Sequence, residues 1–479
     1  MTRHRGAEIR AGLDHPVIDA DGHGIEFIPL VRDLLEGISD RSVAERFEEQ
    51  ISSARTVWRL RPAQRRAFGS MRASWWILPA RNTLDRATAM LPALLASRLD
   101  DLGIDHAVLY PTYGLMVAPL DDAELRCALA RAFNLYYAEA FAEHGDRLTP
   151  VGVIPIHTPE EALAELDFAT GELGLKAFTF GAPVSRPMLG AEGPSGGRWV
   201  DNLAIDSRYD YDPVWERCVE LGVSPTFHTS SIGWHTHGSV SNYVYNHLGM
   251  FGTASEVMCR ALVLGGVCSR FPSLRFGFQE GGVGWGAALF VTLVGHWEKR
   301  NGSAIEHYNP ANLDRTLLSN LFAEHGSEAF NQRTHRMDEA LDYLSFPDEP
   351  LEGRDEFAAS GVTSTADLTR IFSEQLFFGC EADDPMAAVA FDRRKGLLGA
   401  TLQPLFASDI GHWDVRDIED VLPEAWELVE HGHLVEDEFR DFTYANAVRL
   451  WASTNPAFFN GTSVAGAERL VDRVGRPPA

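Results

Sequence analysis

Eight short apolar runs are the feature of this sequence that most restricts its fold. They lie at about 16–21, 106–111, 149–155, 175–180, 223–229, 274–279, 375–379 and 404–408. Each run has the length of a strand and is almost continuously apolar, as expected for parallel strands that are covered on both faces.

Segments with helical periodicity lie between these runs. The clearest are 121–144, 159–172 and 212–221, and the last two carry a proline near the first turn. Alternating strands and helices are typical of parallel α/β proteins, and eight such units favour a closed (β/α)8 TIM barrel over an open sheet.

Two gaps between strands are longer than an ordinary crossover. Residues 24–105 follow the first strand, and residues 281–374 follow the sixth. Long excursions in a barrel often form lids or dimer surfaces. Neither stretch has the composition of a separate domain, so we expect one domain over 1–479 with two long insertions.

Composition limits the partners. The chain has 479 residues, 45% of them apolar, and a net charge of -26, which disfavours nucleic acid and anionic membranes because they repel an acidic protein. No apolar stretch approaches a membrane span of about 18 residues, and Met1 to Leu13 lacks the apolar region of a signal peptide. We therefore expect a cytoplasmic protein that binds a small-molecule substrate. The five cysteines are scattered without a CxxC pair, so a thiolate zinc site is not indicated.

Ionisable residues stand where several of the runs end. Asp21 and His23 close the first run, His228 the fifth, Glu280 the sixth and Asp409 the eighth. A buried charge is costly unless a partner, a proton or a metal neutralises it, and barrel active sites are built at the carboxyl ends of the strands. These residues predict a metal site at the mouth of the barrel.

Three further residues are candidate ligands. His247 and His412 offer additional nitrogen donors, the latter in an Asp-x-x-His pattern after the eighth strand. Glu26, three residues after His23, fits a ligand and a helix N-terminal carboxylate about equally well.

Four residues are expected to contact substrate. Trp234 and Trp285 would form an apolar wall, and Glu381 follows the seventh strand, where it reaches substrate or a ligating imidazole. His235 lies in a Gly/Ser-containing loop, so contact with substrate or solvent is favoured there over metal ligation.

Five segments together resemble the amidohydrolase-related family of the metal-dependent amidohydrolase superfamily. They are IDADGH, RLDDLGIDHAVLYPT, FHT, RFPSLRFGFQEGGVGW and FASDIGHWD. The resemblance implies a His-x-His on the first strand, a His on the fifth, a His on the sixth and an Asp on the eighth. This sequence departs from that pattern at Asp21 and at Glu280.

The departures suggest a particular chemistry. The sixth-strand imidazole that the resemblance implies for proton transfer is replaced by Glu280, a carboxylate able to bridge two ions. Carboxylate/imidazole sites with open positions suit iron and manganese. The site resembles those of non-haem dinuclear monooxygenases, with two ions (Fe/Fe or Fe/Mn), dioxygen as co-substrate, and Glu280 and Asp409 as catalytic groups.

Two other interpretations remain open. A mononuclear hydrolase or decarboxylase, with zinc or manganese, would use Asp409 as general base beside a metal-bound water. A catalytically inactive barrel that binds a partner is the third. The resemblance also implies a homodimer.

Overall fold

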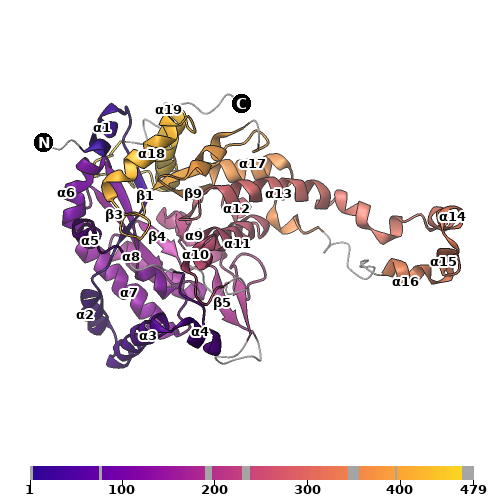
Figure 1. Ribbon diagram of the computed structural model, residues 1–479, viewed down its shortest axis with the longest axis horizontal. Helices are drawn as coiled ribbons and strands as arrows, with labels where there is room; N and C mark the ends of the chain where they lie inside the picture. Colours follow the sequence, from indigo (N-terminus) through magenta and orange to yellow (C-terminus); the bar gives the residue numbers. More distant parts are fainter. Residues whose placement is uncertain are drawn as a thin grey trace.

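A computed structural model describes residues 4–74, 78–188, 197–228, 238–342, 355–393 and 396–466. Its centre is one eight-stranded parallel sheet whose order is β1-β2-β3-β4-β7-β8-β9-β10 (Figure 1). The strands are β1 (Ile18–Gly24), β2 (His106–Pro111), β3 (Leu148–Ile154), β4 (Ala177–Phe180), β7 (Pro225–Phe227), β8 (Phe276–Phe278), β9 (Leu376–Glu381) and β10 (Gln403–Ala407). Each strand overlaps one of the eight predicted runs, and the predicted TIM barrel is confirmed.

Backbone contacts past the end of β10 bring the two edges of this sheet together. The Asp409 amide donates to the Asp21 carbonyl oxygen at 3.0 Å, and the His23 amide donates to the Ile410 carbonyl oxygen at 3.1 Å. The chain that follows β10 therefore runs alongside β1, and the two carry their side chains to one place.

The helices surround the barrel. They are α1 (Arg5–Gly12), α2 (Ile28–Ile38), α3 (Arg41–Arg59), α4 (Pro62–Phe68), α5 (Thr83–Met90), α6 (Pro92–Leu102), α7 (Ala123–Ala140), α8 (Pro159–Gly171), α9 (Asp212–Leu221), α10 (Tyr243–His247), α11 (Met250–Leu264), α12 (Val267–Arg270), α13 (Gly284–Arg300), α17 (Thr365–Glu374), α18 (Val421–Glu430), α19 (Glu436–Arg440) and α20 (Asn446–Ala452). The three helices that periodicity predicts are α7, α8 and α9. Asp122 and Thr158 cap the first two by accepting backbone N–H groups, which explains where these helices begin.

A separate apolar cluster fills the amino end of the barrel. Ile18, Val151 and Leu405 of the strands pack in one cluster with Leu450 and Trp451 of α20. This packing leaves the carboxyl end as the open mouth.

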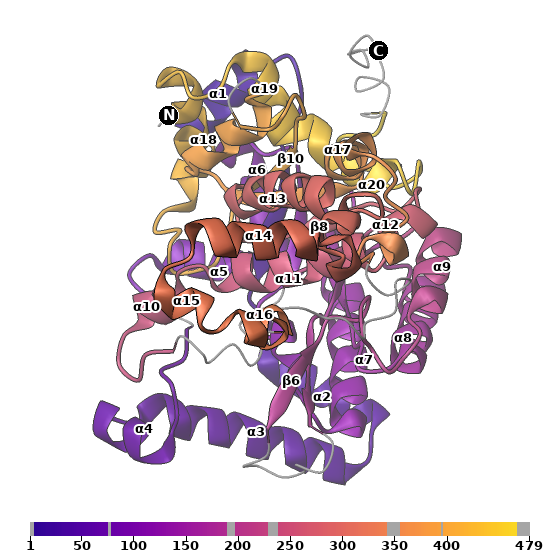
Figure 2. The same ribbon diagram turned by 90° about the vertical axis from the view of Figure 1, so that its right-hand side faces the viewer.

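The first long insertion forms α2 to α6. Its helices α3 and α4 lie along one end of the molecule, beyond α2 and the small antiparallel hairpin of β5 (Val184–Pro187) and β6 (Arg198–Asp201) (Figure 2).

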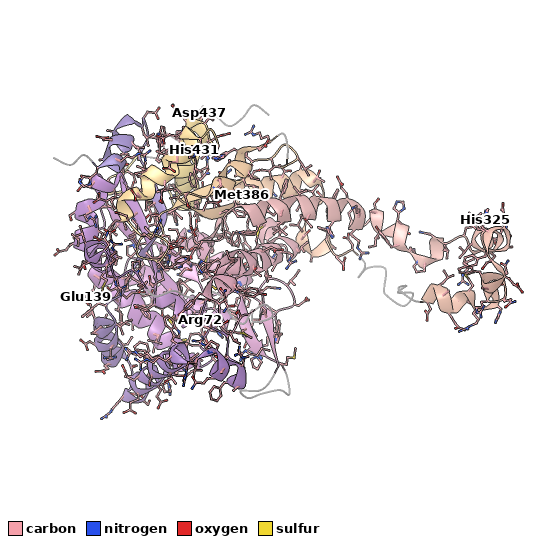
Figure 3. The ribbon with its side chains drawn as sticks, in the orientation of Figure 1. Arg72, Glu139, His325, Met386, His431 and Asp437 are labelled. Carbon is pink, nitrogen blue, oxygen red and sulfur yellow. The ribbon has the colours of Figure 1, made fainter. Side chains whose placement is uncertain are left out.

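The second insertion continues from α13 into an arm that projects from the body (Figure 1). The arm carries α14 (Arg315–His325), α15 (Glu328–Asn331) and α16 (Met337–Asp342), and none of these helices buries a side chain. Figure 3 places His325 at its far end. No helix among the described residues is long and apolar enough to span a membrane.

Candidate metal centre

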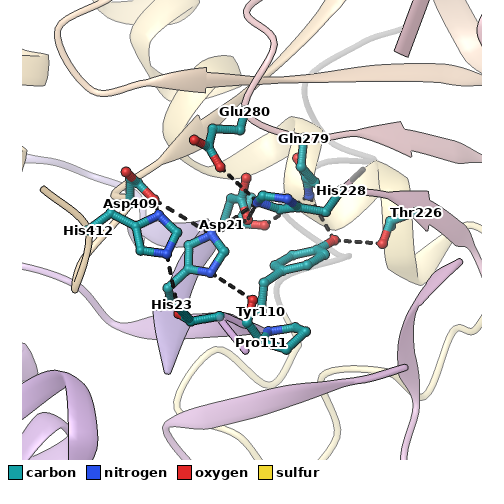
Figure 4. Close-up of polar contacts among 12 residues, drawn as sticks. Asp21, His23, Tyr110, Pro111, Thr226, His228, Gln279, Glu280, Asp409 and His412 are labelled. Atoms are coloured by element: carbon teal, nitrogen blue, oxygen red, sulfur yellow. Dashed lines mark hydrogen bonds and ion pairs between the residues drawn. The ribbon is translucent and has the colours of Figure 1, made fainter. Parts of the chain in front are cut away.

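Ionisable side chains from four strand ends meet at the carboxyl end of the barrel (Figure 4). They are Asp21, His23, His228, Glu280, Asp409 and His412. No member of this cluster has a side chain more than 4% exposed. The barrel thus gathers into one buried volume six residues that are spread over most of the chain.

Gly22 allows the end of β1 to carry two of these side chains. The pairing with β2 is irregular between Asp19 and Gly22. A Cβ on Gly22 would lie 2.5 Å from Asp19 Oδ2 and 2.8 Å from Leu109 Cδ2, so only glycine fits without a shift of its neighbours.

Two of the acids stand on unusual backbone. Glu280 has φ 55° and Asp409 has φ 48°, both in the left-handed region that non-glycine residues rarely adopt. Such residues cost of order 1–3 kcal/mol each and cluster at functional sites, where the surrounding structure holds them. Each acid comes two residues after its strand, so the sharp turn keeps it at the mouth.

The donor atoms lie in two groups that share His23. One group is Asp21, His23 and His228, and the other is His23, Glu280, Asp409 and His412. Within and between them, His228 Nε2 is 3.6 Å from Asp21 Oδ1 and 3.1 Å from Glu280 Oε2. His412 Nδ1 is 2.6 Å from Asp409 Oδ1. His23 joins the groups, since its Nε2 lies 3.0 Å from His228 Nε2 and 3.6 Å from Asp409 Oδ1.

Burial opposes charge on every member of the cluster. It raises the pKa of Asp21, Glu280 and Asp409 well above the usual carboxyl range, and the charge of Asp414 raises the pKa of Glu280 and Asp409 further. Burial also lowers the pKa of all three cluster imidazoles, those of His23, His228 and His412. Burial therefore favours the uncharged form of every member, and the cluster itself supplies no fixed positive charge.

A divalent cation fits this donor set. Asp21 Oδ1 and Glu280 Oε2 are buried and accept no hydrogen bond from the described part of the chain, which is costly for carboxylate oxygens. Carboxylate oxygen and imidazole nitrogen bind zinc and manganese at about 2.0–2.2 Å. In each group of candidate ligands the donor atoms lie within 4.8 Å of one another, close to the spacing around one ion.

Neighbouring groups orient two of the imidazoles. The His23 ring meets the Pro111 carbonyl oxygen through Nδ1 at 3.1 Å, so Nδ1 carries the proton and Nε2 is free to bind a metal. Thr112 Oγ1 lies 3.2 Å from His412 Nε2, which leaves His412 Nδ1 facing Asp409. The end of β2 thus positions ligands from β1 and from the segment after β10.

A chain of hydrogen bonds beneath the cluster was not predicted. Gln279 donates to the Tyr110 hydroxyl at 2.8 Å, and Tyr110 donates to Thr226 Oγ1 at 2.8 Å (Figure 4). Gln279 also donates to the Ala20 carbonyl at 3.1 Å. The only signal in the sequence is a polar residue before Glu280, which carried no role by itself.

Two predicted ligands lie outside the cluster. Glu26 is buried, but its oxygens accept hydrogen bonds from the backbone amides of Tyr113 and Gly114 at 2.9 Å each and from the Tyr137 hydroxyl. Its geometry is that of a residue holding the loop after β2, not of a metal ligand. His247 is half-buried against Phe251 and Trp413, beside the cluster and not among its donor groups.

The predicted substrate contacts are placed in part. Glu381 ends β9, and burial together with the charges of Asp414 and Glu280 raises its pKa to about 8. Trp285 begins α13 and packs edge-on against Phe378, next to the turn that carries Glu280. Trp234 and His235 lie outside the described residues.

Solved structures share the fold. An amidohydrolase from Mycobacterium avium subsp. paratuberculosis aligns with a TM-score of 0.55 at 17% identity, covering 92% of this chain and 98% of its own. A 2,6-dihydroxybenzoate decarboxylase, solved with 2,6-dihydroxybenzoate, aligns with a TM-score of 0.50 at 14% identity, covering 91% and 99%.

Curated relatives are similar over part of their length. A 2-amino-3-carboxymuconate-6-semialdehyde decarboxylase of Dictyostelium discoideum is 26% identical over 187 residues, 38% of this chain and 45% of that protein. A 2-keto-4-carboxy-3-hexenedioate hydratase of a Sphingobium species is 25% identical over 228 residues, 47% of this chain and 58% of that protein. The matched region thus spans about half the length of these relatives.

These relatives overturn one prediction. They are a decarboxylase and a hydratase, which are lyases, so the dinuclear monooxygenase with dioxygen as co-substrate is wrong, and iron has no support among them. Glu280 stands where the family resemblance implies an imidazole on the sixth strand. This replacement changes the proton-transfer group and does not require redox chemistry. Residues 61–310, more than half of the chain, match the family model Amidohydro_2, and this protein therefore belongs to that amidohydrolase family.

Proposed function

We propose that this protein is a metal-dependent lyase that removes carbon dioxide from, or adds water to, a small carboxylic acid. One observation carries the proposal: three carboxylates and three imidazoles converge, buried, at the barrel mouth of a chain whose curated relatives catalyse these two reactions. The predicted alternative of a decarboxylase thus becomes the leading interpretation.

The cluster favours one ion per chain. Both groups of donor atoms include His23, and one imidazole nitrogen has one lone pair and binds one ion. His23, His228, Asp21 and Asp409 would hold this ion, and manganese or zinc suits such oxygen and nitrogen donors. The ion would polarise an oxygen of the bound substrate.

Glu280 is the proposed proton donor. When carbon dioxide leaves, the electron pair of the broken carbon–carbon bond stays on the substrate carbon, and a proton must take its place. Hydration likewise delivers a proton to one carbon of a double bond while the oxygen of water joins the other. Glu280 stands at the barrel mouth with its Oε2 3.1 Å from His228 Nε2, and burial raises its pKa, which favours the protonated carboxyl that a proton donor needs.

The test combines a chelator, isotopes and one substitution. Purified protein, stripped with a chelator and reloaded with manganese or zinc, is incubated anaerobically in D2O with unsaturated and aromatic carboxylic acids. The proposal expects metal-dependent release of carbon dioxide, or gain of water, with one deuterium on carbon in the product. Glu280→Gln should retain the metal and lose about 10²–10⁴-fold in kcat, the usual size of a general acid contribution.

Two results would contradict it. Turnover that survives complete removal of metal would exclude a metal-dependent reaction, and turnover that requires oxygen would exclude a lyase. The structure is of a single chain and does not test the predicted homodimer, which stays a prediction.

A further inference from the structure

A cavity of about 670 Å³ adjoins the metal-site residues under α3. Thr112 lines it, and Thr112 Oγ1 lies 3.2 Å from His412 Nε2. Phe47 and Trp58 of α3 also line it. The cavity therefore comes within one side chain of the cluster and is lined by α3 of the first insertion.

Its walls are apolar along most of their length. Side chains of α3, of the short helix at Gly114–Val117 and of α7 line it, among them Ile51, Val117 and Phe133. The volume lies within the roughly 300–1,000 Å³ of small-molecule pockets and equals that of roughly twenty waters at about 30 Å³ each. A small single-ring acid at the metal would leave much of this space unfilled.

The charged residues of the cavity have one sign. Arg55, Arg59 and Arg86 line it, and no aspartate or glutamate does. None of the three arginines forms an ion pair with a residue that the structure describes, whereas Arg41, on the same helix, pairs with Glu45 at 2.9 Å. Arg55 and Arg59 are exposed, and Arg86, which is half-buried, donates to the Pro79 carbonyl oxygen at 3.3 Å. In a protein with a net charge of -26, a cavity wall without acids and with three guanidinium groups outside any described ion pair is suited to an anionic ligand.

We propose that this cavity is a specificity pocket for the distal part of the substrate, an extended apolar chain or ring system that ends in a second carboxylate. This inference rests on the proposed function, which places the reacting carboxylate at the metal. The apolar body lies against α3 and α7, and the second carboxylate is bound by Arg55, Arg59 and Arg86.

Calorimetric titration of the manganese-loaded protein with unreactive acids tests the pocket without turnover. The probes are succinate, dodecanedioate and dodecanoate. Dodecanedioate should bind about fivefold tighter than dodecanoate, the factor that corresponds to about 1 kcal/mol for a partly exposed ion pair. Succinate is too short to occupy both the metal and the arginine end of the pocket.

Variants assign the effect to the pocket. The double variant Arg55→Gln/Arg59→Gln should remove the preference for dodecanedioate and leave succinate binding unchanged. Arg41→Gln, on the same helix but outside the cavity, should keep the preference. Met116→Trp, which replaces a side chain of the cavity wall by a larger one, should weaken the binding of both long acids and leave succinate binding unchanged.

Equal binding of dodecanedioate and dodecanoate by the wild type would overturn the proposed pocket. A preference for dodecanedioate that survives in the double variant would overturn it too. The lyase proposal fails differently. If the preference holds while metal-dependent lyase activity is absent, the proposed function is wrong and the pocket stands. If activity is present while the preference is absent, only the pocket is wrong.

Discussion

Replacing Gly22 by alanine tests how the metal-site strand is built. The new methyl carbon would lie 2.5 Å from Asp19 Oδ2, 2.8 Å from Leu109 Cδ2 and 3.2 Å from Ser408 Oγ. Ordinary carbon contacts are about 3.5–4.0 Å, so the Asp19 carboxylate must move by roughly 1 Å.

That carboxylate cannot move freely. Asp19 is fully buried and accepts hydrogen bonds from the Ser408 hydroxyl at 2.6 Å, the Ser408 amide at 3.0 Å and the Asp21 amide at 3.2 Å. Overpacking costs about 1–3 kcal/mol, and one weakened hydrogen bond to a charged group costs about 1.5–3 kcal/mol more. Reduced backbone entropy of the unfolded chain returns about 0.5–1 kcal/mol. The free energy of unfolding should therefore fall by about 1.5–5.5 kcal/mol.

Guanidinium unfolding, extrapolated linearly to water, measures the loss. Gly37→Ala is the matched control, since Gly37 lies in α2 with no atom within 4 Å of its added Cβ, and it should be neutral or stabilising by up to about 1 kcal/mol. Metal content should also fall in Gly22→Ala, because Asp21 and His23 flank the site of the clash. A Gly22→Ala protein within about 0.5 kcal/mol of wild type, as for a neutral surface change, would refute this account of the strand.

Three further predictions address other parts of the molecule. His228→Ala should reduce bound metal from one ion per chain to near none, while the far-ultraviolet circular dichroism spectrum stays native. The control His296→Ala, on the surface of α13, should keep the metal. Full metal loading of His228→Ala would exclude His228 as a ligand. Glu26→Gln should lower the free energy of unfolding by about 1–3 kcal/mol, because an amide NH2 would face donors that now meet a carboxylate, and metal content should not change; loss of metal would instead support ligation. Burial holds the pKa of His106 at about 3, so between that value and the unfolded value of about 6.5 the unfolded chain binds the extra proton, and stability falls as the pH falls through this window. In urea titrations, the free energy of unfolding of the wild type should fall between pH 7 and pH 5 by about 2 kcal/mol more than that of His106→Gln. An equal fall in both proteins would show that His106 is charged in the folded protein.

The barrel could be predicted because its strands are nearly continuous apolar runs. Each of the eight strands is buried on both faces and is therefore an apolar run that can be recognised from the local sequence alone. The exact ends of the strands depend on pairing between strands, which the local pattern does not contain. The first run was expected to stop at Asp21, whereas β1 continues to Gly24 because His23 and Gly24 pair with Tyr110 and Pro111 of β2.

The cluster could be predicted in part for a geometric reason. Parallel strands of a closed barrel end at the same mouth, so acids and imidazoles at strand ends must meet there. Glu26 shows where that reasoning stops: its distance along the chain from His23 suits ligation, but its hydrogen-bond partners follow β2. Asp414 shows the converse. It lies in a predicted motif and raises the pKa of both Glu280 and Asp409, yet nothing in its local sequence distinguishes it from a surface acid.

The proposed metal and the arginine-lined cavity address one electrostatic problem. A dicarboxylate that approaches a protein with a net charge of -26 is repelled over most of the surface. A bound cation would reverse the sign of the charge at the reacting end, and Arg55, Arg59 and Arg86 reverse it along the cavity wall. Charges in a cavity with low-dielectric walls act more strongly than those on the open surface, so this one path attracts the anion that the rest of the molecule repels. Loss of the metal alone should therefore weaken binding of long and short acids alike, whereas loss of the arginines should weaken only the long ones.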